Sequence, residues 1–261
     1  MNFQTRDVIV KYDDLVVHRS DKLLIGGPCS VESKDQLFRV AEVVREEGFR
    51  FLRGGAFKPR TNPYSFQGMQ EEGLILLKQA AEKFDLKIVT EIVDVSHLPL
   101  YLDTVDILQI GARNMSNFYM LKQLAGAPKP ILLKRGFAAR IEELLLAAEY
   151  LVSGGNEQVI LCERGIRTFE TATRATLDLA SVPIVKKISP LPIIVDPSHA
   201  TGRSDIVINM ALAGLVAGAD GIIVEVHPNP AKALCDGLQS LTLDDFRKLC
   251  REIKRLTPFL S

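Results

Sequence analysis

The chain has 261 residues, of which 47% are hydrophobic and 25% charged, as in an ordinary globular protein. Its 32 basic and 32 acidic residues cancel, so we expect neither a nucleic-acid partner nor an acidic membrane surface. No apolar run approaches the ~20 residues of a membrane-spanning helix, and the N-terminus lacks the basic and apolar regions of a signal peptide. A cytoplasmic location is therefore expected.

Residues 1–22 are predicted to form a short β-hairpin that precedes the main fold. Two apolar runs, Val8 to Val10 and Leu15 to Val17, flank the polar stretch from Lys11 to Asp14. The pattern leaves open whether this N-terminal extension closes the bottom of the following domain or joins a subunit interface.

From residue 23 on, short apolar runs alternate with segments of helical periodicity. Eight runs lack the polar alternation of exposed strands, which is typical of parallel strands buried on both faces. They cover residues 23–27, 49–53, 87–91, 106–110, 130–134, 158–162, 192–196 and 221–225. The intervening helices are predicted after a capping box at Ser33 to Gln36 and over residues 68–84, 96–102 (cut by Pro99), 116–124, 139–152, 168–180, 204–217 and 243–256.

This alternation predicts an α/β fold with a single (β/α)₈ TIM barrel over residues 23–261. A doubly wound sheet is the alternative architecture. No linker or second composition regime is visible, and so few residues flank the barrel that no separate regulatory domain is expected.

The stretch RGGAFKPRTNPYSF, residues 53–66, carries the strongest local signal. It follows a strand and holds Arg53, Lys58 and Arg60 among glycines and prolines, which restrict the loop. Such a loop is suited to gripping phosphate or carboxylate groups.

Active sites of barrel enzymes lie at the carboxyl ends of the strands, and most of the chemically active side chains follow the predicted strands. Six cations are expected to converge there: Arg53, Lys58, Arg60, Arg113, Lys134 and Arg164. Their mutual repulsion would be relieved by an anion that carries several charges. Any one of them could instead form an ion pair with a nearby acid such as Glu91 or Glu163.

Four further side chains at the same rim offer metal ligands: Cys29, His199, Glu225 and Asp236. A thiolate, an imidazole and two carboxylates suit a divalent transition metal better than calcium or magnesium. His227 and Cys235 are rival ligands. The scattered positions of the four cysteines argue against a disulfide framework.

The motifs at these strand ends resemble those of the 3-deoxy-D-arabino-heptulosonate 7-phosphate (DAHP) synthases, in particular the compact type Iβ subgroup related to 3-deoxy-D-manno-octulosonate 8-phosphate synthase. The resemblance runs from about Leu23 to the C-terminus. It rests on GPCSVES (27–33), RGGAFKPRTNPYSFQG (53–68), QIGARNM (109–115), LKRG (133–136), CERG (162–165), DPSHATGR (196–203), EVHPNP (225–230) and CDG (235–237).

The resemblance implies a transferase that condenses phosphoenolpyruvate with erythrose 4-phosphate and water, giving the seven-carbon product and phosphate, as the first step of the shikimate pathway towards the aromatic amino acids. It implies a cytoplasmic homotetramer or homodimer and a divalent metal such as Mn²⁺, Fe²⁺, Co²⁺ or Zn²⁺. The metal ligands would be Cys29, His199, Glu225 and Asp236, of which Cys29 and His199 are essential to catalysis.

The resemblance also assigns the substrates. Phosphoenolpyruvate would lie against Arg53, Lys58, Ala112, Arg113, Lys134 and Arg164. The aldose phosphate would contact Arg60 and Thr61. Lys58 would protonate the new alkoxide or stabilise its charge, and Glu91 would orient the attacking water.

Alternative functions differ from this condensation either in the acceptor sugar or in having no catalysis at all. Octulosonate 8-phosphate synthesis from arabinose 5-phosphate, or a sialic-acid-type condensation, would use the same enol donor. The sequence Lys-Pro-Arg-Thr at 58–61 favours the four-carbon sugar, because the octulosonate synthases carry Lys-Ala-Asn-Arg-Ser there. A non-catalytic phosphate-binding barrel would need no metal ligands.

Overall fold

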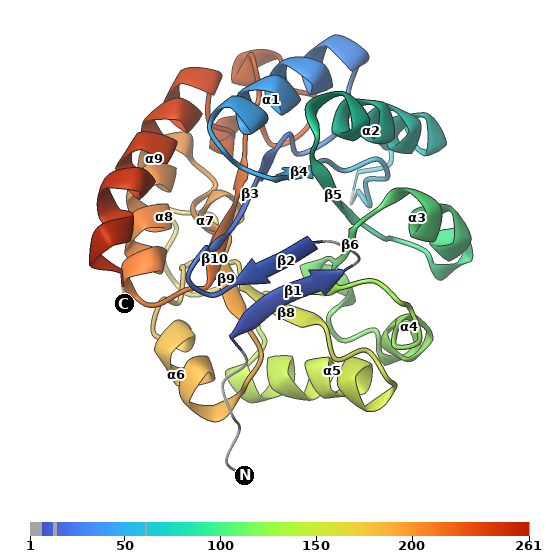
Figure 1. Ribbon diagram of the computed structural model, residues 1–261, viewed down its shortest axis with the longest axis vertical. Helices are drawn as coiled ribbons and strands as arrows, with labels where there is room; N and C mark the ends of the chain where they lie inside the picture. Colours follow the sequence, from blue (N-terminus) through green and yellow to red (C-terminus); the bar gives the residue numbers. More distant parts are fainter. Residues whose placement is uncertain (1–6, 13–14, 61, 261) are drawn as a thin grey trace.

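The computed structural model describes residues 7–12, 15–60 and 62–260. In this part of the chain eight parallel strands pair side by side into a closed barrel, which confirms the predicted TIM barrel (Figure 1). Strand β10 closes the ring by pairing with both β3 and β9. The strands are β3 (Leu23–Gly27), β4 (Phe51–Arg53), β5 (Lys87–Glu91), β6 (Ile107–Ile110), β7 (Ile131–Lys134), β8 (Val159–Glu163), β9 (Ile193–Val195) and β10 (Gly221–Glu225).

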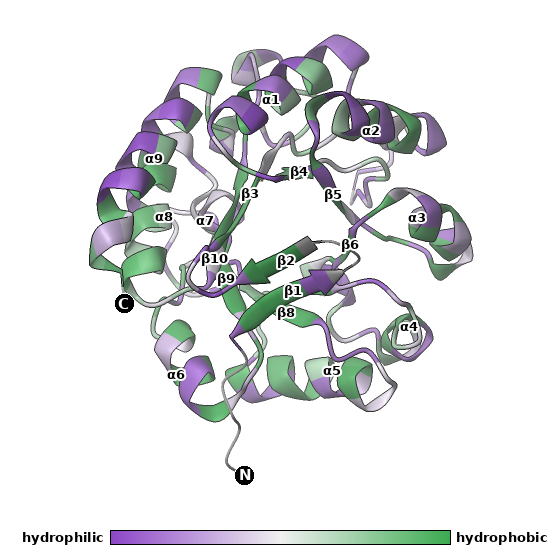
Figure 2. Cartoon of the chain, in the orientation of Figure 1, coloured by the Kyte–Doolittle hydropathy of each residue, from purple (hydrophilic) through white to green (hydrophobic). Residues whose placement is uncertain are grey.

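Helices surround the barrel and cover its outer face (Figure 1). They carry hydrophobic residues toward the strands and hydrophilic residues toward solvent (Figure 2). The α-helices are α1 (Lys34–Glu46), α2 (Glu71–Phe84), α3 (Leu98–Thr104), α4 (Phe118–Leu124), α5 (Ile141–Ser153), α6 (Ser181–Ile188), α7 (Pro197–Thr201), α8 (Val207–Val216) and α9 (Leu243–Leu256). Short 3₁₀ turns are η1 (Val95–His97), η2 (Ala112–Asn114), η3 (Ser204–Ile206), η4 (Pro230–Lys232), η5 (Gly237–Gln239) and η6 (Thr257–Phe259). Within the described ranges, no helix combines the length and the apolar character needed to cross a bilayer.

The predicted hairpin exists and lies across the end of the barrel at which the strands begin (Figure 1). Strands β1 (Val8–Tyr12) and β2 (Leu15–His18) pair antiparallel. Ile9, Val10 and Val17 are buried in one apolar cluster with side chains from all eight barrel strands. The hairpin therefore closes the bottom of the barrel, which is the first of the two roles that the sequence left open.

Helix starts differ from the prediction in two details. The Ser33 side chain accepts a hydrogen bond from the Gln36 amide, as expected for a capping box. However, the Gln36 side chain bonds Glu32 and Ser30 rather than returning to Ser33, so only half of the box forms. Pro99 does not cut a helix but lies in the first turn of α3, where its missing N–H has no intrahelical partner to lose.

The helix predicted over residues 168–180 is wrong. The segment runs without regular structure, and α6 begins only at Ser181. Its backbone groups find partners outside the segment: Arg174 N donates to Thr201 O and Ala175 N to Ala200 O. Four threonines in the segment also disfavour a helix, because they are β-branched and their hydroxyls compete for backbone partners. One such bond joins the hydroxyls of Thr168 and Thr176.

Candidate active site and metal centre

A cavity of about 270 Å³ opens at the carboxyl ends of the strands, opposite the hairpin. Every strand-end loop that the sequence singled out for cations contributes to it. Its lining is Arg53, Lys58, Pro59, Arg60, Asn62, Ser65, Glu91, Gln109, Gly111, Ala112, Arg113, Lys134, Phe137, Arg164, Arg174, His199 and Asp236. Seven of these side chains are cationic and only two are carboxylates, so the cavity is suited to a multiply charged anion.

The structure brings all six expected cations together, but it pairs two of them with acids other than those considered. Arg53 Nη1 donates to Glu225 Oε1 at 2.7 Å, and Lys134 Nζ donates to Asp196 Oδ2 at 2.5 Å. For Lys58, Arg60, Arg113 and Arg164, no ion pair with a carboxylate is found in the described part of the chain. These four charges have no carboxylate partner in that part of the chain, so an anionic ligand can neutralise them.

Glu163 forms an ion pair with the neighbouring Arg135 rather than with a cavity cation, and its Oε2 lies 2.8 Å from Arg135 Nη1. Its other oxygen accepts a hydrogen bond from the amide of Gly165 at 2.6 Å. Glu163 thus fixes the turn that aims Arg164 into the cavity.

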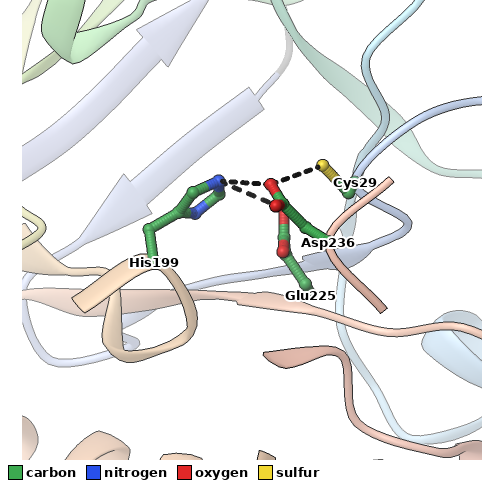
Figure 3. A group of neighbouring side chains, drawn as sticks. All are labelled: Cys29, His199, Glu225 and Asp236. Carbon is green, nitrogen blue, oxygen red and sulfur yellow. Dashed lines mark hydrogen bonds and ion pairs between the residues drawn. The ribbon is translucent and has the colours of Figure 1, made fainter. Parts of the chain in front are cut away.

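The four expected metal ligands lie together at one side of this cavity and point toward one another (Figure 3). One donor atom from each of Cys29, His199, Glu225 and Asp236 lies within 4.8 Å of every other. His199 Nε2 is 3.2 Å from Glu225 Oε1 and 3.9 Å from Asp236 Oδ2. Ligand atoms around one transition metal lie about 3–4 Å apart when the metal bonds are 2.0–2.3 Å long, so a small contraction would complete such a site.

Local structure sets the direction of each ligand. Cys29 follows β3, and Glu225 ends the adjacent β10. His199 lies in α7, whose N-cap residue Asp196 accepts a hydrogen bond from the His199 amide. Asp236 adopts a left-handed backbone conformation, with φ 51° and ψ 36°. A non-glycine residue in this region stores strain, which is common where a side chain must be aimed at a site.

The protonation chemistry of the set fits a divalent metal. Burial lowers the pKa of His199 against the opposing charges of Asp196 and Glu225, and a lowered pKa makes it easier for a metal to displace a proton from Nε2. Its Nδ1 lies 2.7 Å from Asp196 Oδ2, an arrangement that fixes the ring of metal-binding histidines. Burial alone would raise the pKa of Glu225, but the charges of His199 and Arg53 outweigh it and hold this pKa below its usual value.

Of the two thiols near the metal set, Cys29 is one of the four ligands and Cys235 lies beside it. The contact with Cys235, 3.1 Å between sulfurs, and burial raise the pKa of Cys29 well above its usual value, whereas the same contact lowers the pKa of Cys235 to about 7. A divalent metal would have to displace the Cys29 proton, as is usual for thiolate ligands. Cys235 Sγ instead accepts a hydrogen bond from Arg60 Nη1 at 2.7 Å.

His227 turns away from the metal set. Its Nε2 is 3.2 Å from Glu32 Oε2, and its Nδ1 accepts a hydrogen bond from Asn229 N at 3.0 Å. This arrangement makes His227 part of the turn after β10 rather than a ligand.

Lys58 lies between the metal set and the cavity. Its Nζ donates to Cys29 O at 3.2 Å and lies 3.2 Å from Cys29 Sγ. Burial lowers the pKa of Lys58, but the sulfurs of Cys29 and Cys235 outweigh it and raise the pKa above its usual value. Lys58 is therefore a cation at neutral pH and can donate a proton toward a developing negative charge.

Glu91 is held against Gly111, and this contact gives a testable prediction. A Cβ on Gly111 would lie 2.0 Å from Glu91 Oε1, so Gly111→Ala must displace the carboxylate. We expect kcat to fall by about a hundredfold if Glu91 orients a reacting group, with little change in melting temperature because only a side-chain end moves. Gly126→Ala is the matched control, since a Cβ there meets nothing within 4 Å. Unchanged kcat in Gly111→Ala would remove Glu91 from the chemistry.

Several residues of the site were not predicted from the sequence. Arg174 lies in the segment mistaken for a helix, and Phe137 had no motif to mark it. The Phe137 ring lies under two cavity cations, 4.6 Å from Arg164 Cζ and 6.0 Å from Arg113 Cζ. Asp196 was visible at a strand end but gave no sign that it joins His199 and Lys134.

Two further residues, Ala112 and Thr61, were also expected to contact the substrates. Ala112 lines the cavity at the start of η2, next to Arg113. Thr61 lies outside the described residues.

The chain is similar to known proteins over nearly its whole length. Residues 7–260 match the model of the DAHP synthetase I family. The chain is 51% identical over 259 residues to the phospho-2-dehydro-3-deoxyheptonate aldolase of Thermotoga maritima, covering 99% of this chain and 77% of that protein. It is 29% identical to the 2-dehydro-3-deoxyphosphooctonate aldolase of Syntrophobacter fumaroxidans, covering 88% of this chain and 85% of that protein.

Solved structures show the same similarity. The crystal structure of the Thermotoga maritima phospho-2-dehydro-3-deoxyheptonate aldolase (DAHP synthase) superposes with a TM-score of 0.93 at 51% identity, over 97% of this chain and 74% of that one. A truncated form of 3-deoxy-D-arabino-heptulosonate 7-phosphate synthase from Thermotoga maritima gives 0.89 at 48% identity, over 97% and 92%. The chain belongs to the DAHP synthetase I family.

Proposed function

We propose that this protein condenses phosphoenolpyruvate with erythrose 4-phosphate and water, releasing phosphate and forming 3-deoxy-D-arabino-heptulosonate 7-phosphate. The main support for the proposal is that the candidate metal ligands adjoin the cationic cavity. A four-residue metal-binding set opens onto a cavity lined by seven cations. Family membership supports the same chemistry.

The cationic wall is the proposed seat of the enol phosphate. Arg113 and Arg164, stacked on Phe137, would take the phosphate, and Lys134 and Arg53 would take the carboxylate. Arg53 Nε is buried and has no hydrogen-bond partner among the described residues. Because buried donors are normally satisfied, this N–H indicates an acceptor supplied by a ligand.

The chemistry forms a C–C bond and a C–O bond to water, and it breaks the C–O bond to phosphate. C3 of phosphoenolpyruvate would attack the aldehyde carbon, water oriented by Glu91 would add at C2, and the resulting phosphohemiketal would expel phosphate toward Arg113 and Arg164. A divalent transition metal (Mn²⁺, Fe²⁺, Co²⁺ or Zn²⁺), held by Cys29, His199, Glu225 and Asp236, would supply Lewis acidity toward the aldehyde oxygen. Lys58, charged and next to Cys29, would donate the proton that the new hydroxyl requires.

The alternative acceptor is arabinose 5-phosphate, giving the eight-carbon product. Relatives named 2-dehydro-3-deoxyphosphooctonate aldolase are 29% identical to this chain, against 51% for the heptonate enzyme. The lower similarity and the sequence at 58–61 favour the four-carbon sugar. A non-catalytic phosphate-binding barrel would have no use for the clustered ligands.

The deciding experiment measures phosphate release from phosphoenolpyruvate after chelator treatment and metal add-back, with each sugar in parallel. We expect metal-dependent release with a clear preference for erythrose 4-phosphate. A preference for arabinose 5-phosphate would retain the enol donor and overturn the acceptor, and no release with either sugar would overturn the condensation.

Arg60 is expected to determine affinity for the sugar phosphate. Its guanidinium lines the cavity and donates to Cys235 Sγ at 2.7 Å. Arg60→Ala should raise KM for erythrose 4-phosphate about 10- to 100-fold, the value of one charge-assisted contact, and change KM for phosphoenolpyruvate little. Steady-state kinetics with each substrate varied in turn measure both constants. Equal changes in the two constants would contradict the assignment.

A further inference from the structure

Arg174 is a cavity cation with no role in the proposed chemistry. It lies in the segment from Ile166 to Thr176, whose ends are joined by reciprocal backbone hydrogen bonds of 2.9 Å. Arg174 N donates to Thr201 O at 2.9 Å, at the end of α7, the helix that carries His199. The backbone at Arg174 is thus tied to the element that aims one metal ligand.

The side chain of Arg174 reaches a second ligand. Its Nη1 lies 3.4 Å from Asp236 Oδ1 and donates to Gln239 Oε1 at 3.0 Å. Gln239 is 2% exposed, and its Nε2 donates to Glu225 Oε2 at 2.6 Å. Because the amide oxygen accepts from Arg174, the amide nitrogen must face Glu225, so one arginine orients groups at both carboxylate ligands.

These contacts use one oxygen of each carboxylate and leave the other facing the ligand set. Asp236 Oδ1 is on the Arg174 side, while Oδ2 faces Cys29 Sγ at 3.3 Å. Glu225 Oε2 is on the Gln239 side, while Oε1, which also accepts a hydrogen bond from Arg53 Nη1 at 2.7 Å, faces His199 Nε2 at 3.2 Å.

We propose that Arg174, acting with Gln239, is a positioning residue of the metal centre. The pair holds Asp236 and Glu225 so that each presents one oxygen to a divalent ion. This inference rests on the proposed metal site and goes beyond it, because neither side chain offers a ligand atom to the ion in this arrangement. Partners of this kind typically strengthen metal binding 10- to 100-fold.

The test measures metal affinity without substrate. Purified, metal-free wild type, Arg174→Ala, Gln239→Ala and the double variant compete with a chromophoric chelator for Co²⁺. We expect each single change to raise the Kd for Co²⁺ about 10- to 100-fold, and the double change to raise it by less than the product, because both residues act on the same carboxylates. Arg174→Lys, which keeps one donor, should recover part of the loss.

Two controls separate positioning from general effects. Arg203→Ala removes a different arginine that pairs with an exposed aspartate, Asp205, and should leave the Kd unchanged. The visible spectrum of bound Co²⁺ should change in Arg174→Ala, because carboxylate coordination changes, while the thiolate charge-transfer band of Cys29 persists. Arg174 is more than one third exposed, so its truncation is expected to leave the fold intact.

The outcomes are distinct. An unchanged Kd and spectrum in Arg174→Ala, with a raised KM for either substrate, would make Arg174 a substrate contact and overturn the inference alone. Failure of the wild type to bind Co²⁺ or any other divalent transition metal would overturn the proposed metal centre itself.

Discussion

Cys29→Ala is expected to abolish metal-dependent turnover. The change removes the only sulfur ligand of the four-residue set, and alanine fits the buried position without adding bulk. Since Lewis-acid stabilisation is worth several kcal/mol, we expect kcat/KM to fall at least about a thousandfold. Metal content after dialysis and the rate of phosphate release measure the effect, and His199→Ala should give a loss of the same order.

The other cysteines provide matched controls for this prediction. Cys250 is a buried thiol of α9, and Cys250→Ala should leave both metal content and turnover near the wild-type values. Cys235→Ala removes the rival thiol, 3.1 Å from Cys29, and should leave metal bound. Loss of metal from Cys235→Ala, with retention in Cys29→Ala, would exchange the two assignments.

Asp196→Asn is expected to lower the free energy of unfolding by about 3–5 kcal/mol, as measured by urea denaturation of the metal-free protein. Asp196 is 1% exposed. Its Oδ2 accepts a hydrogen bond from Lys134 Nζ at 2.5 Å and lies 2.7 Å from His199 Nδ1. Burial opposes ionisation, but the charges of His199 and Lys134 outweigh it and hold the pKa of Asp196 well below its usual value. The neutral amide would leave the Lys134 ammonium buried without its counter-charge.

A second substitution makes this prediction sharper. Combining Asp196→Asn with Lys134→Met removes both charges, so much of the lost stability should return, although activity should not. Asp205→Asn, at an exposed ion pair with Arg203, should not change the unfolding midpoint measurably. Additive losses in the double variant would show that the ion pair is not the source of the destabilisation.

The sequence predicted the barrel well because the relevant signals are local. Each buried strand is a short run of branched apolar residues, and α9 spans residues 243–256 as its periodicity indicated. The hairpin was visible in the same way, but its place under the barrel depends on Ile9, Val10 and Val17 contacting residues far along the chain. Local patterns do not encode such contacts.

The segment from 168 to 180 shows where local patterns fail. Its spacing resembles a helix, yet its amides bond α7 residues and its Arg174 reaches Asp236. Tertiary contacts at a functional site thus outweighed local preference, which is where such conflicts are expected. The candidate ligands could be named because strand ends meet at one rim, whereas the pairing of Asp196 and Gln239 with them depends on distances that sequence does not supply.

In the proposed site, one metal held by four side chains faces a cationic seat for the enol phosphate. Diffraction from crystals soaked with Mn²⁺ and phosphoenolpyruvate, collected to use the anomalous signal of manganese, tests it most directly. We predict a single anomalous peak within bonding distance of Cys29 Sγ, His199 Nε2 and the carboxylates of Glu225 and Asp236, with the phosphate against Arg113 and Arg164. A peak elsewhere, or a phosphate bound outside the cavity, would contradict the account.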